Sequence, residues 1–178
     1  QNQFRWSQRI DRDAGFVRLV WGLGTRAVDQ LGGDYPRLVA LSHPDLRPET
    51  SVRKILRYSQ KYVDLIDLDD NSLRSLMVTD IVKTRTPNLR WVAQRHEHDH
   101  LQDFFSLPIS LVPHEVVITF KGMINETKFP ALMRHMLSQL EEQYRRPVDT
   151  EFTVRLQENE QGRIVPKICL LQCRVQSR

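Results

Sequence analysis

Apolar and polar residues alternate along the last quarter of the chain, and this alternation predicts two β-strands. Over 148–154, an extended backbone places Asp149 and Glu151 on one face and a mostly apolar set on the other. Over 168–174, one face carries Ile168, Leu170, Gln172 and Arg174. If the two strands pair as a hairpin, one face gathers two carboxylates, a carboxamide and a guanidinium.

This set of polar groups suits a magnesium ion that carries phosphates. Carboxylate and carboxamide oxygens are hard ligands, and an adjacent Arg binds phosphate oxygens. A surface hairpin with ordinary solvated charges explains the same spacing equally well. The alternation by itself leaves both interpretations open.

A period of 3.6 residues predicts one long helix over 128–145. Its apolar residues form a single stripe: Phe129, Leu132, Met133, Met136, Leu137, Leu140 and Tyr144. Thr127 suits the N-cap position, and Pro130 is tolerated in the first turn. The stripe indicates packing against a core, and the helix leads to Pro147, where the first of the two strands begins.

The rest of the chain predicts short strands separated by turns. Strands are expected over 16–21, 37–41, 61–68, 73–78, 89–94 and 116–120, with a short helix over 80–85. Asp69-Asp70-Asn71 is a turn signal that makes 61–68 and 73–78 antiparallel neighbours. The pattern indicates a mixed, strand-rich fold.

Composition sets limits on the possible function. The 178 residues are 40% hydrophobic, which is enough for one core, and no stretch approaches the roughly 20 apolar residues of a membrane span. The net charge of +4 is spread along the chain among interleaved acids, so nucleic-acid binding is not favoured. Cys169 and Cys173 lie about 13 Å apart on one strand, too far to bridge. Free, strand-buried cysteines and the lack of a signal peptide predict a cytoplasmic protein without a membrane partner.

Two glycines follow the first predicted strand. Gly22-Leu23-Gly24-Thr25 indicates a tight turn before a helix. Closely spaced glycines at such a place let backbone N–H groups approach a phosphate. Gly22 and Gly24 are therefore candidate nucleotide contacts, and a plain turn is the alternative.

Three histidines form the second candidate cluster. In an extended chain His96, His98 and His100 share one face, about 6.6 Å apart, a spacing that ligates a metal only if the strand bends or other residues help. The alternative is a polar, hydrated loop between Gln94 and Leu101. We favour the loop, because zinc sites usually combine distant segments.

The tail of the chain resembles the end of the nucleotide-binding domain of pyruvate phosphate dikinase and phosphoenolpyruvate synthase, which rifampin phosphotransferase shares. The family pattern reads P-x-D-x-E-[FW]-[TA], then a hairpin, then [LV]-Q-x-R-P. The first part matches Pro147-Val148-Asp149-Thr150-Glu151-Phe152-Thr153, and the last part matches Leu171-Gln172-Cys173-Arg174. The resemblance implies that Glu151 and Gln172 hold the magnesium ion of ATP, that Arg174 reaches the phosphates as the catalytic residue, and that Asp149 supports them. Two departures are a longer loop over 154–167 and Val175 in place of Pro.

A second block near the N-terminus is similar to another segment of the same family. Gly22-Leu23-Gly24-Thr25 stands where the family has G-L-G-E, and Tyr35-Pro36-Arg37-Leu38-Val39 stands at its P-D-x-[FY] signature. The resemblance implies that Gly22 and Gly24 contact the nucleotide. Thr25 departs from the family, which carries Glu there.

The resemblance also implies a fold, partners and a function. The expected fold is α+β, an ATP-grasp-like lobe with a mainly antiparallel sheet and packed helices. Residues 1–178 are expected to form a single domain, the C-terminal part of the nucleotide-binding domain of a longer chain. Its partners would be ATP, the remaining lobe with its phosphate-binding Lys and Arg, and a phosphohistidine-type domain.

Two functions follow from the resemblance. The first is an ATP-dependent phosphotransferase that uses Mg²⁺, with pyruvate, an antibiotic or a protein histidine as acceptor. Without the upstream Lys and Arg, these residues alone would bind Mg-ATP weakly at best and hydrolyse none. The second is a non-catalytic nucleotide-sensing or interaction module that keeps the fold, which Thr25 and Val175 favour.

Overall fold

The computed structural model describes residues 5–28, 33–83, 86–105 and 111–176. The chain divides into two compact units, each built from separate stretches of sequence. Unit 1 comprises Gln1–Val17, Val39–Pro48 and Met123–Arg178, and unit 2 comprises Arg18–Leu38 and Glu49–Gly122. A single domain over residues 1–178 stays a prediction.

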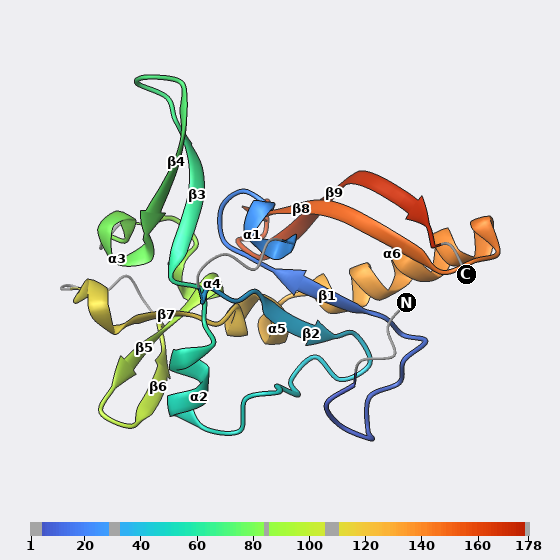
Figure 1. Cartoon of the computed structure of the whole chain (residues 1–178), viewed down its shortest axis with the longest axis horizontal. Coiled ribbons are helices and arrows are strands. Elements are labelled where there is room, and N and C mark those ends of the chain that lie inside the picture. Colours follow the sequence, from blue (N-terminus) through green and yellow to red (C-terminus); the bar gives the residue numbers. More distant parts are fainter. Residues whose placement is uncertain (1–4, 29–32, 84–85, 106–110, 177–178) are drawn as a thin grey trace. The chain divides into compact units, whose positions relative to one another are not determined.

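Helices and strands are interspersed along the chain (Figure 1). In order, the elements are β1 (Phe16–Leu19), α1 (Thr25–Val28), β2 (Arg37–Ala40), α2 (Val52–Arg57), β3 (Tyr62–Asp67), β4 (Ser72–Met77), α3 (Val78–Ile81), α4 (Leu89–Val92), β5 (Ala93–Glu97), β6 (His100–Asp103), the 3-10 helix η1 (Pro113–Glu115), β7 (Val116–Ile118), α5 (Lys121–Glu126), α6 (Phe129–Tyr144), β8 (Val148–Glu158) and β9 (Ile164–Val175). The mixture confirms the expected α+β class. No helix of the described residues is long and apolar enough to cross a membrane.

Unit 1 is organised around α6 and the hairpin of β8 and β9, drawn in orange and red (Figure 1). Phe129 and Met133 of α6 are completely buried, and the ring of Phe129 lies 6.3 Å from the ring of Phe152 on β8. The apolar face of β8 therefore packs on the N-terminal half of α6. The prediction that the whole stripe packs against a core is wrong in part, because two of its members, Leu132 and Tyr144, are exposed.

The start of α6 also differs slightly from the prediction. Lys128, not Thr127, occupies the N-cap position, and its side chain makes no capping bond. Thr127 still stabilises the entry, because its hydroxyl donates to the Met123 carbonyl and accepts from the Phe129 N–H. The helix therefore begins one residue later than the spacing indicates, with Pro130 in its first turn as predicted.

Unit 2 contains two small antiparallel sheets. β3 pairs with β4 from Tyr62 opposite Met77 to Asp67 opposite Ser72, which confirms the predicted hairpin. Asn71 supplies the left-handed turn with a φ of 55°. β5 lies between β6 and β7, with antiparallel pairing on both sides. β1 and β2 form a further two-stranded sheet, and the boundary between the two units falls within both strands.

Three sequence predictions in unit 2 are wrong in part. The strand expected over 89–94 begins as the helical turn α4, because Leu89 and Val92 are buried at helical spacing, and becomes extended only at Ala93. The helix expected over 80–85 is the short α3, after which Val82 is extended, and residues 84 and 85 lie outside the described residues. The histidine segment is a hairpin of β5 and β6, not an irregular loop.

Candidate functional site

The hairpin of β8 and β9 carries the residues that the sequence places at the site. The two strands pair antiparallel from Val148 opposite Val175 to Glu158 opposite Ile164. Asn159 builds the turn between them, because its side-chain oxygen accepts from the N–H groups of Gln161 and Arg163. The prediction of a loop over 154–167 is therefore wrong, because only residues 159–163 connect the two strands and the rest of this stretch is paired. The long ladder fixes the positions of the side chains on its faces.

The register brings the four predicted polar residues together. Glu151 lies directly opposite Gln172, and Asp149 lies directly opposite Arg174. Directly opposed residues of an antiparallel pair project from the same face of a sheet. The prediction that these four residues converge on adjacent antiparallel strands is therefore confirmed.

One extra residue in β9 changes the pattern beyond this group. The register shifts between Glu151 and Phe152, where Leu171 has no partner on β8, so β9 contains a β-bulge. Beyond the bulge, Leu170 lies opposite Phe152 on the face away from Glu151. The predicted alternation is wrong here: Ile168 and Leu170 do not share a face with Gln172 and Arg174.

Direct contacts organise the polar group. The Arg174 guanidinium donates to Gln172 Oε1 at 2.8 Å and lies 4.0 Å from Glu151 Oε1. Gln176 Nε2 donates to Asp149 Oδ1 at 2.6 Å. The side chains of Glu151 and Arg174 are 60% and 68% exposed, so the group faces solvent and is open to a ligand.

The end of β9 explains how the chain accommodates Val175 where the family pattern has Pro. Val175 lies opposite Val148, and the N–H of Gln176 donates to the carbonyl of Pro147 at 2.9 Å. The ladder thus continues past Arg174, which holds the backbone on both sides of that residue.

The Gly22–Thr25 turn of unit 2 packs closely on β3. Gly22 has a φ of +97°, and a Cβ at this position would lie 2.5 Å from Val63 Cγ1 and 2.6 Å from the carbonyl oxygen of Asp64. The N–H of Leu23 donates to that same carbonyl at 2.8 Å. Close packing therefore accounts for Gly22, whereas a Cβ added at Gly24 would meet no neighbouring atom within 4 Å.

We expect Gly22→Ala to lower the free energy of unfolding by about 2 kcal/mol or more, because the added methyl overlaps backbone in an unfavourable conformation. Gly24→Ala is the matched control and should change stability by no more than about 0.5 kcal/mol. Urea unfolding of both variants measures the difference. Equal stability of the two variants would contradict the packing assigned to Gly22.

A buried ion network that the sequence analysis missed follows this turn. Arg26 Nε lies 2.8 Å from Asp64 Oδ1, and Arg26 Nη1 lies 3.1 Å from Asp34 Oδ2. Asp34 also accepts from the backbone N–H groups of Lys61 and Tyr62. The three charged side chains are no more than 10% exposed. The sequence signal was Asp64, a carboxylate between apolar neighbours in a strand.

The network holds Asp64 in its charged form. Burial opposes ionisation of Asp64, but hydrogen bonds from Thr25, Arg26 and Ser75 outweigh it and keep the pKa of Asp64 below its ordinary value. The Thr25 hydroxyl donates to Asp64 Oδ2 at 2.6 Å. Both Thr25 and Arg26 therefore fasten the turn to β3.

Comparison with known families decides the identity of the chain. The family model described as pyruvate phosphate dikinase, AMP/ATP-binding domain, matches residues 5–178. The chain belongs to this family. No curated protein and no solved structure matches the chain.

The match covers both blocks on which the resemblance rests, the Gly22–Thr25 turn and the tail from Pro147 to Arg174. It confirms the family and identifies the chain as an AMP/ATP-binding domain of the pyruvate phosphate dikinase type. That it forms the C-terminal portion of such a domain stays a prediction.

Other polar groups of this AMP/ATP-binding domain lie outside the predicted set. On the β5–β6 hairpin, His96 lies opposite Leu101, His100 lies opposite Glu97, and His98 occupies the turn with a φ of 53°. No group of three or more His, Cys, Asp or Glu side chains in the described part of the chain is arranged to hold a metal ion. Magnesium that keeps its waters and phosphate oxygens needs only one or two protein oxygens, which Glu151 and Gln172 can provide.

The two cysteines differ from the prediction. Cys169 is exposed on the Glu151 face of the hairpin, opposite Thr153, and only Cys173 is partly buried. The β-bulge places them on opposite faces. The description of both as strand-buried is therefore wrong.

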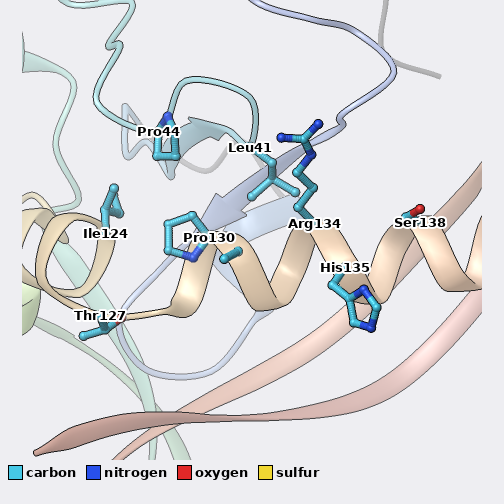
Figure 2. A pocket seen from close by; sticks show the side chains of 9 residues that line it. Leu41, Pro44, Ile124, Thr127, Pro130, Arg134, His135 and Ser138 are labelled. Atoms are coloured by element: carbon cyan, nitrogen blue, oxygen red, sulfur yellow. The ribbon is translucent and has the colours of Figure 1, made fainter.

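A hollow of about 580 Å³ runs along α6 in unit 1. Its lining comprises Leu41, Pro44, Ile124, Thr127, Pro130, Ala131, Arg134, His135 and Ser138. Figure 2 shows Pro130 and Arg134 on the side of α6 that faces Leu41, whereas His135 points the other way. None of the predicted site residues lines this hollow.

Proposed function

We propose that this chain supplies Mg-ATP ligands to an ATP-dependent phosphotransferase of the phosphoenolpyruvate synthase and pyruvate phosphate dikinase type, as an ATP-grasp-like lobe. The observation that supports this most strongly is the register of the hairpin. In this register Glu151 lies opposite Gln172, and the neighbouring pair is Asp149 with Arg174. The two pairs place hard oxygen ligands and a guanidinium together on one exposed face.

Each residue has a distinct role in the proposal. Glu151 and Gln172 would ligate Mg²⁺ through side-chain oxygens, and Asp149, held by Gln176, would add negative charge beside the ion. Arg174 would bind the phosphates and neutralise the charge that develops on the transferred group. Gln172 Oε1 accepts from Arg174, so the guanidinium also orients the carboxamide.

The turn of unit 2 has a separate place in the proposal. Gly22 and Gly24 would contact the nucleotide through the backbone, and the open space beside Gly24 leaves room for a ligand group. The further partners proposed are the remaining lobe of the nucleotide-binding domain and a phosphohistidine-type domain.

One observation favours the second function, a nucleotide-sensing or interaction module. The Thr25 hydroxyl, at the position where the family carries Glu, donates to the buried Asp64 and is occupied within the fold. The Glu of the family pattern is thus replaced by Thr25, whose side chain makes a structural contact within the fold.

Binding of Mg-ATP to the chain tests the proposed function. We expect ATP with Mg²⁺ to shift the backbone amide resonances of Glu151 and Gln172, and we expect ATP with a chelator to leave them in place. Isotope transfer from labelled ATP by the complete protein then separates the two functions, because a sensor binds ATP without transfer. Shifts that are equal with and without Mg²⁺ would reject the metal site.

A further inference from the structure

A second pair of cations lies on the Glu151 face of the hairpin. Arg155 of β8 lies directly opposite Lys167 of β9, and both side chains are exposed. Like charges directly opposite each other on a sheet destabilise the pairing. The hairpin carries this repulsion within paired strands, since the pairing continues beyond Arg155 and Lys167 to Glu158 and Ile164.

No counter-charge within the described residues offsets this repulsion. Neither Arg155 nor Lys167 forms an ion pair with any described side chain. The adjacent pairs on the same face, Thr153 with Cys169 and Gln157 with Val165, contain no acid. An external anion is therefore the group that would relieve the repulsion.

The cation pair belongs to the same surface as the proposed metal ligands. Arg155 lies four residues from Glu151 along β8, which corresponds to about 13 Å of strand. The side chains of Arg and Lys are long and flexible, so their charged groups can turn along the face toward Glu151 and Gln172. Cations thus flank Glu151 and Gln172 on both sides: Arg174 on one side, Arg155 and Lys167 on the other.

We propose that Arg155 and Lys167 bind the far end of a phosphate chain whose other part is held at Glu151, Gln172 and Arg174. A chain of three phosphates reaches farther along the face than a chain of two, so the hairpin selects a triphosphate over a diphosphate. This inference rests on the proposed function. It adds a specificity determinant made of residues outside the predicted ligand set.

Titration with inorganic tripolyphosphate and pyrophosphate, each with Mg²⁺, tests the inference. The wild-type chain should bind tripolyphosphate about tenfold more tightly than pyrophosphate, because charge-assisted hydrogen bonds to phosphate are among the strongest in proteins. The double variant Arg155→Gln/Lys167→Gln should lose this preference and keep its affinity for pyrophosphate. The control Arg146→Gln/Arg163→Gln makes the same change in net charge at exposed positions outside the strands and should keep the preference.

The outcomes separate this inference from the proposed function. A double variant that folds and still prefers tripolyphosphate would overturn the role of the cation pair, while loss of Mg²⁺-dependent binding in Glu151→Gln would continue to support the metal site. Binding of tripolyphosphate that needs no Mg²⁺ but is abolished in the double variant would support the cation pair and reject the metal site. Absence of any binding in the wild type would overturn both.

Discussion

Glu151→Gln should reduce ATP-dependent phosphoryl transfer by the complete protein about 10²-fold or more. The substitution removes one negative charge at the proposed magnesium site and keeps the size of the side chain. Removing a single electrostatic contact to the transition state typically has an effect of about this size. Arg174→Ala should have a similar effect, because Arg174 lies beside both proposed ligands. Isotope transfer from labelled ATP measures both.

The same strand provides a matched control. Glu158→Gln makes the identical chemical change on β8, but Glu158 lies on the other face of the hairpin, opposite Ile164. We expect this variant to keep wild-type transfer. Circular dichroism should show an unchanged fold in every variant, since Glu151 and Arg174 are exposed. Wild-type transfer in both Glu151→Gln and Arg174→Ala would refute the catalytic proposal.

Arg26→Met should lower the free energy of unfolding of unit 2 by about 3–5 kcal/mol. The variant leaves Asp34 and Asp64 buried without the guanidinium that both contact, and loss of one partner of a buried ion pair has an effect of this size. The Arg26 side chain also lies over the ring of Tyr62, 5.2 Å from its centroid. Urea unfolding followed by tryptophan fluorescence measures the change.

Arg74→Met is the control, because Arg74 pairs with Asp67 and Asp70 at the surface. Exposed pairs contribute no more than about 1 kcal/mol, so this variant should remain close to the wild type. Hydrogen exchange gives a local measure: the Lys61 and Tyr62 amides, which donate to Asp34, should lose protection only in Arg26→Met. Equal stability of the two variants would contradict the assigned network.

The pH of these measurements matters because of Asp64. Its pKa in the folded protein lies below the ordinary value, so folding favours the ionised carboxylate. The stability that Asp64 contributes is fully present above the pKa of the unfolded chain, about 3.9. It is lost as the pH falls through the lower pKa of the folded state. Measurement near pH 7 therefore records the full effect of Arg26→Met.

Local patterns in the sequence were sufficient to predict that the four polar residues of the hairpin lie together. Alternation over 148–154 predicted that Asp149 and Glu151 share one face of a strand. Pairing of this strand with 168–174 as a hairpin then places Gln172 and Arg174 on the same face. The β-bulge was not predictable in this way. Cys169, Leu170 and Leu171 are three consecutive apolar residues, and such a run does not reveal which of them has no partner.

The remaining errors come from interactions that alternation does not encode. Arg26 and Asp64 are 38 residues apart in sequence, and their pairing depends on how the Gly22–Thr25 turn meets β3. α4 spans only four residues, too few for a helical period to stand out from an apolar strand. The Thr25 departure from the family became interpretable only when its bond to Asp64 was known.

The β-bulge at Leu171 divides the hairpin ladder into two segments. The inner segment, from Val148 to Glu151 on β8, contains the Glu151–Gln172 pair. The outer segment, from Phe152 to Glu158, has a register of its own and leads to the turn at Asn159. A gain or loss of paired residues near the turn changes only the outer segment. The residues that lengthen this hairpin relative to the family pattern are mostly paired strand on the turn side of the bulge, so equal additions to both strands there leave the Glu151–Gln172 pair and its four polar groups in place.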